Sequence, residues 1–133
     1  LTNEVHDALL EHARDGTPEE VCGVLGGRCG SDTRVESVHR VPNVASQPRV
    51  EYVIDPEAQL DVMEDIETSG EAVVGFYHSH PDGPNEPSET DVTRATWPGF
   101  YYLIVSLPGQ TVGTWHWDGE RFEREEIRVL SRR

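Results

Sequence analysis

Apolar residues return along this chain at two spacings, one typical of helices and one of strands. Near the N-terminus they recur every three or four residues as far as Gly16, with Thr2 as a candidate N-cap, which predicts a first amphipathic helix. A second helix is predicted from Pro56 to about Ser69, because Asp55 offers an N-cap and proline suits the first helical position. The apolar positions of the first helix are Leu1, Val5, Ala8, Leu9 and Ala13.

Seven further segments are rich in β-branched and aromatic residues and are bounded by turn residues, which predicts strands. They span residues 19–28, 33–45, 49–55, 72–80, 100–107, 111–118 and 121–130. A hairpin turn is predicted at Gly30-Ser31-Asp32, and others at Pro108-Gly109 and Asp118-Gly119. A short third helix is predicted to begin at Ser88 and to end by Pro98-Gly99.

Strands and helices are interleaved without an internal repeat, a low-complexity tract or a linker. A length of 133 residues matches one domain with a core of its own. The sequence therefore predicts an α/β fold over residues 1–133, with one mixed central sheet flanked by two or three helices.

Charge narrows the range of partners. The chain carries 25 acidic residues against 11 basic ones, all arginine, for a formal net charge of −14. So acidic a chain lacks the basic surface that nucleic acid binding needs. An acidic surface without lysine is typical of proteins from a salt-rich cytoplasm, where the screening length falls to about 3 Å at 1 M salt. A mildly acidic enzyme from a low-salt organism is the alternative.

Two features concern the compartment. Cys22 and Cys29 form no C-x-x-C motif, and two cysteines do not make a disulfide framework, so we expect free thiols. No apolar run approaches the roughly 20 residues needed to cross a bilayer. We expect a cytoplasmic protein that does not bind membranes.

The candidate metal-binding residues are concentrated in one stretch, GFYHSHPDGPNEPSETDVTRA, residues 75–95. His78 and His80 are two residues apart on a predicted strand, so both side chains point to one face and Ser79 points to the other. Asp91 lies in the first turn of the next predicted helix, which the intervening loop can fold back over the strand end. Two imidazoles and one carboxylate leave a fourth tetrahedral position open, as in catalytic zinc sites.

Each half of this pattern also has a purely structural explanation. His-x-His is common on strands, and Ser88-x-x-Asp91 makes an acceptable helix capping box. The two halves at this spacing are much more specific than either alone.

The combined pattern resembles the signature of the JAMM or MPN-plus metallopeptidases, His-x-His, seven residues, then Ser-x-x-Asp. Residues 78–91 match it at every defined position, and Glu20-Val21-Cys22-Gly23 resembles the family's upstream Glu-x-Cys-Gly segment. The order of elements also fits the family's fold, which is similar to that of cytidine deaminases. The short loops resemble those of minimal prokaryotic and archaeal members.

The resemblance implies a role for each matched residue. His78, His80 and Asp91 would bind one Zn²⁺ per chain, Glu20 would act as general base and then as acid, and Ser88 would donate to the oxyanion. The neighbouring Glu19 would face away, because successive strand residues point to opposite sides.

The resemblance also implies a substrate, the bond after the C-terminal glycine of a small ubiquitin-like modifier joined to lysine or in a linear fusion. We expect the modifier's extended tail to add as a strand beside residues 46–54. Two alternatives remain open: a peptidase acting on a sulfur-carrier protein, and a scaffold module that keeps the fold without catalysis. The Pro-Cys-x-x-Cys of zinc deaminases and the His-Glu-x-x-His of other metalloproteases are absent. The sequence leaves the oligomeric state open.

Overall fold

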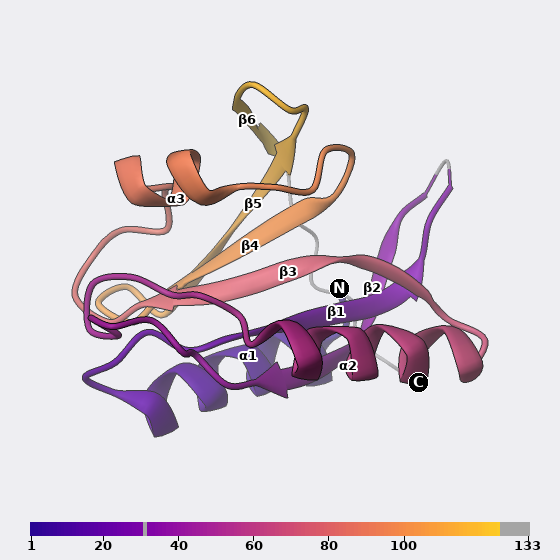
Figure 1. The fold of residues 1–133 in the computed structure, drawn as a ribbon, viewed down its shortest axis with the longest axis horizontal. Helices are drawn as coiled ribbons and strands as arrows, with labels where there is room; N and C mark the ends of the chain where they lie inside the picture. Colours follow the sequence, from indigo (N-terminus) through magenta and orange to yellow (C-terminus); the bar gives the residue numbers. More distant parts are fainter. Residues whose placement is uncertain (31, 126–133) are drawn as a thin grey trace.

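The computed structural model describes residues 1–30 and 32–125, and within them a six-stranded mixed sheet is the organising element (Figure 1). The strands are β1 (Cys22–Arg28), β2 (Arg34–Val41), β3 (Ala72–His80), β4 (Tyr101–Ser106), β5 (Thr111–Trp117) and β6 (Phe122–Glu125). Their order is β2-β1-β3-β4-β5-β6, with β3 and β4 parallel and every other pair antiparallel. The predicted mixed α/β fold is confirmed.

The helices form where the predicted caps stand. Helix α1 (Asn3–Gly16) has Thr2 as N-cap, whose hydroxyl accepts from the amide of Val5 at 3.1 Å. Helix α2 (Pro56–Thr68) has Asp55 as N-cap and proline in its first turn. Helix α3 (Glu89–Arg94) starts at Ser88 with a complete capping box, and it ends at Arg94, short of Pro98-Gly99. Its position between β3 and β4 makes it part of their parallel crossover (Figure 1).

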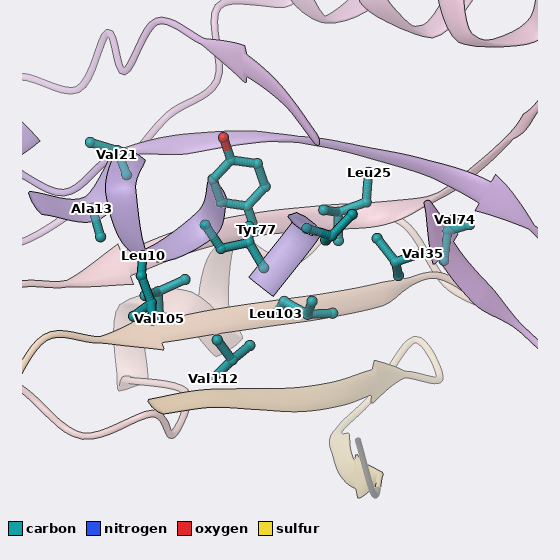
Figure 2. Packing of buried hydrophobic residues seen from close by; sticks show 12 residues of the cluster. Leu10, Ala13, Val21, Leu25, Val35, Val74, Tyr77, Leu103, Val105 and Val112 are labelled. Carbon is teal, nitrogen blue, oxygen red and sulfur yellow. The ribbon is translucent and has the colours of Figure 1, made fainter. Parts of the chain in front are cut away.

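Two apolar clusters cover the two faces of the sheet. One joins α1 to side chains such as Leu25, Tyr77 and Leu103, and Figure 2 shows this layer with the tyrosine ring at its centre. The other joins α2 to Val24, Phe76 and their neighbours. Because side chains alternate along a strand, residues 76, 78 and 80 of β3 lie on the α2 face.

The predicted strand at 49–55 is wrong. That segment is extended but makes a single bridge, between Asn43 and Ile54, and no ladder. Some of its main-chain groups bond to a side chain: Asn43 Oδ1 accepts from the amide of Val53, and Asn43 Nδ2 donates to the carbonyl of Glu51. Others bond to nearby main-chain groups, as the carbonyl of Val53 does to the amide of Val44. The expected addition of a substrate's tail beside residues 46–54 would therefore meet an extended segment rather than the edge of the sheet, and it stays a prediction.

Other boundaries differ by a few residues. Strand β1 begins at Cys22 rather than at residue 19, because Glu19 and Glu20 bond to loops, as Glu20 N–H does to the carbonyl of Pro48 at 2.7 Å. Ser31 and residues 126–130, parts of a predicted turn and strand, lie outside the described residues. Both cysteines are free thiols, as expected. Among the helices described, none has the length and apolar character needed to cross a membrane.

A buried histidine on α1 makes stability depend on pH. His12 Nδ1 lies 2.6 Å from the hydroxyl of Tyr77, and burial lowers the pKa of His12 to about 4, with Arg40 adding to the effect and Asp15 opposing it. In the unfolded chain the imidazole of His12 takes up a proton at about pH 6.5, whereas in the folded chain it stays neutral down to about pH 4. The free energy of unfolding should therefore fall as the pH drops through that window. Denaturant titrations of the parent chain and His12→Gln should show a flatter pH dependence for the variant, and equal slopes would contradict this assignment.

Molar salt should stabilise the fold, because screening relieves the repulsion within a chain of net charge −14. We expect the melting temperature to rise between low and molar KCl, as measured by circular dichroism. A melting temperature that stays constant or falls would contradict the interpretation of the surface as a halophilic adaptation.

Candidate metal centre and active site

The ends of β3 and α3 bring three donor groups together in a buried cluster. His78 Nε2 lies 2.9 Å and His80 Nε2 lies 3.0 Å from the same oxygen, Asp91 Oδ2, and the two nitrogens are 3.2 Å apart. The exposed fractions of His78, His80 and Asp91 are 1%, 8% and 6%. Both histidines therefore point to one face, as the i, i+2 spacing predicts.

The capping box gives Asp91 its direction. The amide of Ser88 donates to Asp91 Oδ2 at 2.9 Å, while Ser88 Oγ accepts from the amide of Asp91 at 3.1 Å. The cap and the donor cluster thus share one carboxylate oxygen. Asp91 thus takes part in the helix cap while its Oδ2 also lies in the donor cluster, so a role at the helix start is compatible with a role as ligand.

The loop between β3 and α3 is held against the sheet at three points. Ser106 Oγ donates to the carbonyl of Gly83 at 2.6 Å, Trp115 Nε1 donates to that of Asn85 at 2.9 Å, and Asn85 Nδ2 donates to Thr111 Oγ1 at 2.9 Å. This anchored loop presents the carbonyl of Pro84 to His80 Nδ1 at 2.7 Å. A carbonyl there requires a proton on Nδ1, so a neutral His80 turns the Nε2 lone pair toward the cluster, as in histidine metal ligands.

Glu20 completes the cluster from the chain before β1. One ligand atom from each of Glu20, His78, His80 and Asp91 lies within 4.8 Å of the others. Glu20 is 6% exposed, and among the described residues its Oε1 has no hydrogen-bond partner. Glu19 is exposed, so the two adjacent acids face opposite ways as the sequence predicts.

Burial and mutual contact set the ionisation of the cluster. Burial raises the pKa of Glu20 to about 7, with His80 opposing the shift and Asp91 adding to it. Burial also acts to raise the pKa of Asp91, but hydrogen bonds from both histidines outweigh it and hold that pKa well below its ordinary value. The carboxylate of Asp91 is thus a permanent anion, whereas Glu20 can take up and release a proton near neutrality.

The two histidines respond differently to the same carboxylate. Burial lowers the pKa of His78, and its bond to Asp91 does not compensate. Burial acts in the same direction on His80, but hydrogen bonds to Asp91 and to the Pro84 carbonyl outweigh it and raise the pKa. A metal ion entering the cluster would displace the proton of His80, so acid should compete with metal binding.

The donor set fits a tetrahedral divalent ion. A zinc ion about 2.0–2.1 Å from each donor needs donors about 3.3 Å apart, and the three separations here are 2.9–3.2 Å. Glu20 Oε1, for which the described part of the chain offers no hydrogen-bond donor, lies near them. Cys22 is not among the donors that lie close enough together to share an ion. Burial raises the pKa of its thiol to about 12.

Some site residues had no signal in the sequence motif. The ring of Tyr52 stacks on that of His78, with centroids 4.2 Å apart and planes inclined by 19°. Tyr52 also lines a pocket of about 390 Å³ with Phe76, Trp97 and Tyr102. A larger, open cleft of about 640 Å³ is lined by Glu20, His80 and Ser88. The pocket adjoins the cluster through Tyr52 and the cleft reaches it directly, so the two hollows offer room for different parts of one substrate.

A buried His-His-Asp cluster with a facing glutamate stands at the end of a mixed sheet, and this donor set suits a hydrolytic metal site. A family described as prokaryotic homologs of the JAB domain matches residues 2–118. The chain belongs to this family, which confirms the resemblance noted from its motif.

The chain is similar to known proteins over three quarters of its length or more. It is 46% identical over 134 residues to a protein of Haloferax volcanii named desampylase, covering 97% of this chain and 94% of that one. It is 41% identical over 100 residues to the CysO-cysteine peptidase of Mycobacterium tuberculosis, covering 75% of this chain and 67% of that one. The solution structure of a protein from Desulfitobacterium hafniense superposes with a TM-score of 0.89 at 34% identity, over 98% of this chain and 92% of that one.

Metal analysis tests the cluster. We expect about one divalent ion per chain by elemental mass spectrometry after loading and desalting. His80→Ala or Asp91→Asn should abolish this binding, because each removes one of three donors, whereas His116→Ala on β5 should retain it. Full metal content in the Asp91 variant would contradict the assignment.

Proposed function

We propose that this chain is a zinc-dependent isopeptidase that hydrolyses the bond after the C-terminal glycine of a ubiquitin-like modifier. The observation that carries the proposal is the convergence of His78, His80 and Asp91 with the buried carboxylate of Glu20. The 46% identity to a protein named desampylase supports the modifier as substrate class. With every motif position filled and the donors gathered, a scaffold without catalysis is not favoured.

In this function His78, His80 and Asp91 would hold the zinc ion. Bound there, zinc supplies a Lewis acid that polarises a carbonyl and lowers the pKa of water to about 7. Two imidazoles and one carboxylate are donors that zinc accepts, and they leave a position for substrate or water.

Glu20 moves the proton. Its pKa of about 7 lets the carboxylate accept a proton from water and return it to the departing amine at neutral pH. Its Oε1 makes no hydrogen bond within residues 1–30 and 32–125, so it is available for this proton transfer. Ser88 Oγ, which accepts from the Asp91 amide, keeps its own proton available for donation to the oxygen of the scissile carbonyl.

The two hollows divide the substrate. The aromatic pocket beside Tyr52 would take an apolar side chain of the modifier's tail, and it includes the 52–54 stretch of the segment expected to guide that tail. The open cleft would take the lysine side, since the carboxylates of Asp82 and Glu86 among its lining residues outnumber the one guanidinium, of Arg49, and favour a cation. Contact with residues 52–54 would then come from side chains in a pocket rather than from strand addition.

A pair of adjacent glutamates tests the role of Glu20. Glu20→Gln should keep zinc and fold but lower kcat by roughly 10²–10⁴, because the general base is lost. Glu19→Gln removes the same charge from an exposed neighbour and should leave kcat unchanged. Steady-state cleavage of a modifier conjugate at matched zinc content, with a chelator control, is the measurement.

The two glutamate variants distinguish an error in the assignment of the base from an error in the proposed substrate. If Glu19→Gln is the inactive variant, the assignment of the base is wrong although the metal site stands. If the zinc-loaded parent chain cleaves no modifier conjugate, the substrate proposal itself fails.

A further inference from the structure

Glu20 lies outside the regular sheet, so something other than a strand ladder must fix its side chain. The β1–β3 ladder ends at the pair Cys22 and His78, two residues short of Glu20. Past that pair the chain leaves the sheet toward a loop, and Glu20 N–H donates to the carbonyl of Pro48. A base displaced by about 1 Å can lose about 10² in rate, so its anchors matter for catalysis.

Ser79, between the two histidines, provides the first anchor. Its hydroxyl accepts from the amide of Val21 at 2.9 Å, and its own amide donates to the carbonyl of Val21 at 3.0 Å. Ser79 is fully buried on the face opposite the histidine rings. A side-chain oxygen thus takes the place of a main-chain carbonyl and extends the pairing by one residue, up to the neighbour of Glu20.

Asn43 provides the second anchor with all four of its hydrogen-bonding positions. Its Nδ2 donates to the carbonyls of Glu20 at 2.9 Å and Glu51 at 3.1 Å. Its Oδ1 accepts from the amides of Ala45 at 3.1 Å and Val53 at 3.0 Å. An amide has two donor protons and two acceptor lone pairs, so this side chain is fully used.

We propose that Ser79 and Asn43 form a clamp that positions Glu20 as the base, an inference that rests on the function proposed above. The two residues differ in the segments of the chain that they hold. Ser79 acts on the Glu20 segment alone. Asn43 also holds both neighbours of Tyr52, which stacks on His78 and lines the aromatic pocket, so it sets the base and the pocket together.

For Ser79, the proposal predicts a loss in kcat without a change in KM. Ser79→Ala should lower kcat roughly 10- to 100-fold at unchanged zinc content. In a Glu20→Gln background the same change should cost nothing more, because the anchor acts through a base that is already gone. Thr114→Val is the matched control, since it removes a buried hydroxyl that has no partner among the described residues and should leave kcat unchanged.

For Asn43, the proposal predicts changes in both constants. Asn43→Asp keeps the two acceptor contacts but loses both donors, so kcat should fall and KM should rise, each by roughly tenfold. Asn3→Asp makes the same chemical change at the first residue of α1, on the other side of the sheet, and should be silent. A rise in KM without loss of kcat would overturn the assignment of Asn43 to the base.

Amide hydrogen exchange tests the clamp independently of catalytic activity. Ser79→Ala should speed exchange at Val21 relative to Thr114→Val, while Val24 within β1 stays protected. Ser79→Cys, close in size with a weak acceptor, serves if the alanine variant does not fold. Unchanged kcat in the Ser79 variant, or a loss that persists without Glu20, overturns the clamp. If the parent chain cleaves no conjugate, the proposed function fails. The exchange experiment still tests the clamp in that case, and equal rates of Val21 amide exchange in Ser79→Ala and Thr114→Val would overturn it.

Discussion

The structure depends on placing three polar donors where water is largely excluded. His78, His80 and Asp91 are almost completely buried, and burying such groups is costly unless each finds a partner. In this chain they partner one another, and the Ser88 amide and the Pro84 carbonyl provide two further hydrogen bonds, while His78 Nδ1 has no partner among the described residues. An ion would replace these mutual contacts, and the loop pinned to β4 and β5 keeps the donors in place for it.

The central strand β3 serves both faces of the molecule at once. Its odd-numbered residues at the site end, Tyr77 and Ser79, face the α1 layer, where one pairs with His12 and the other holds Val21. Its even-numbered residues, His78 and His80, face the cluster. Side chains along a strand alternate between its two faces. The spacing that puts both histidines on the cluster face therefore also puts the serine between them on the opposite face.

Local sequence signals predicted much of this arrangement. The bounds of β3, the N-caps of all three helices and the outward direction of Glu19 follow from patterns within a few residues. The segment 49–55 is rich in β-branched and aromatic residues, which predicts a strand. Its main chain instead bonds to the Asn43 side chain and to the main chain of Pro42 and Val44, and such contacts depend on the fold rather than on local pattern.

The same reason explains the site residues that the motif did not indicate. Tyr52 reaches His78 across 26 positions of the chain, and Asn43 joins Glu20 to residues 51 and 53. Neither residue type is specific for such a role, so composition gives no warning. Family resemblance supplied the roles of Glu20 and Ser88, and the structure adds the burial, the unpartnered oxygen and the raised pKa that make Glu20 suitable as a base.

The central claim is that three residues hold the ion and the fourth carboxylate acts on the substrate. All four donors lie close enough to close a site completely, which would make it structural rather than catalytic. A crystal structure of the zinc-loaded chain with anomalous scattering at the zinc edge distinguishes the two. The account predicts an ion about 2.0–2.2 Å from His78 Nε2, His80 Nε2 and a carboxylate oxygen of Asp91, with Glu20 outside that shell. Direct coordination by Glu20 as a fourth protein ligand would contradict it.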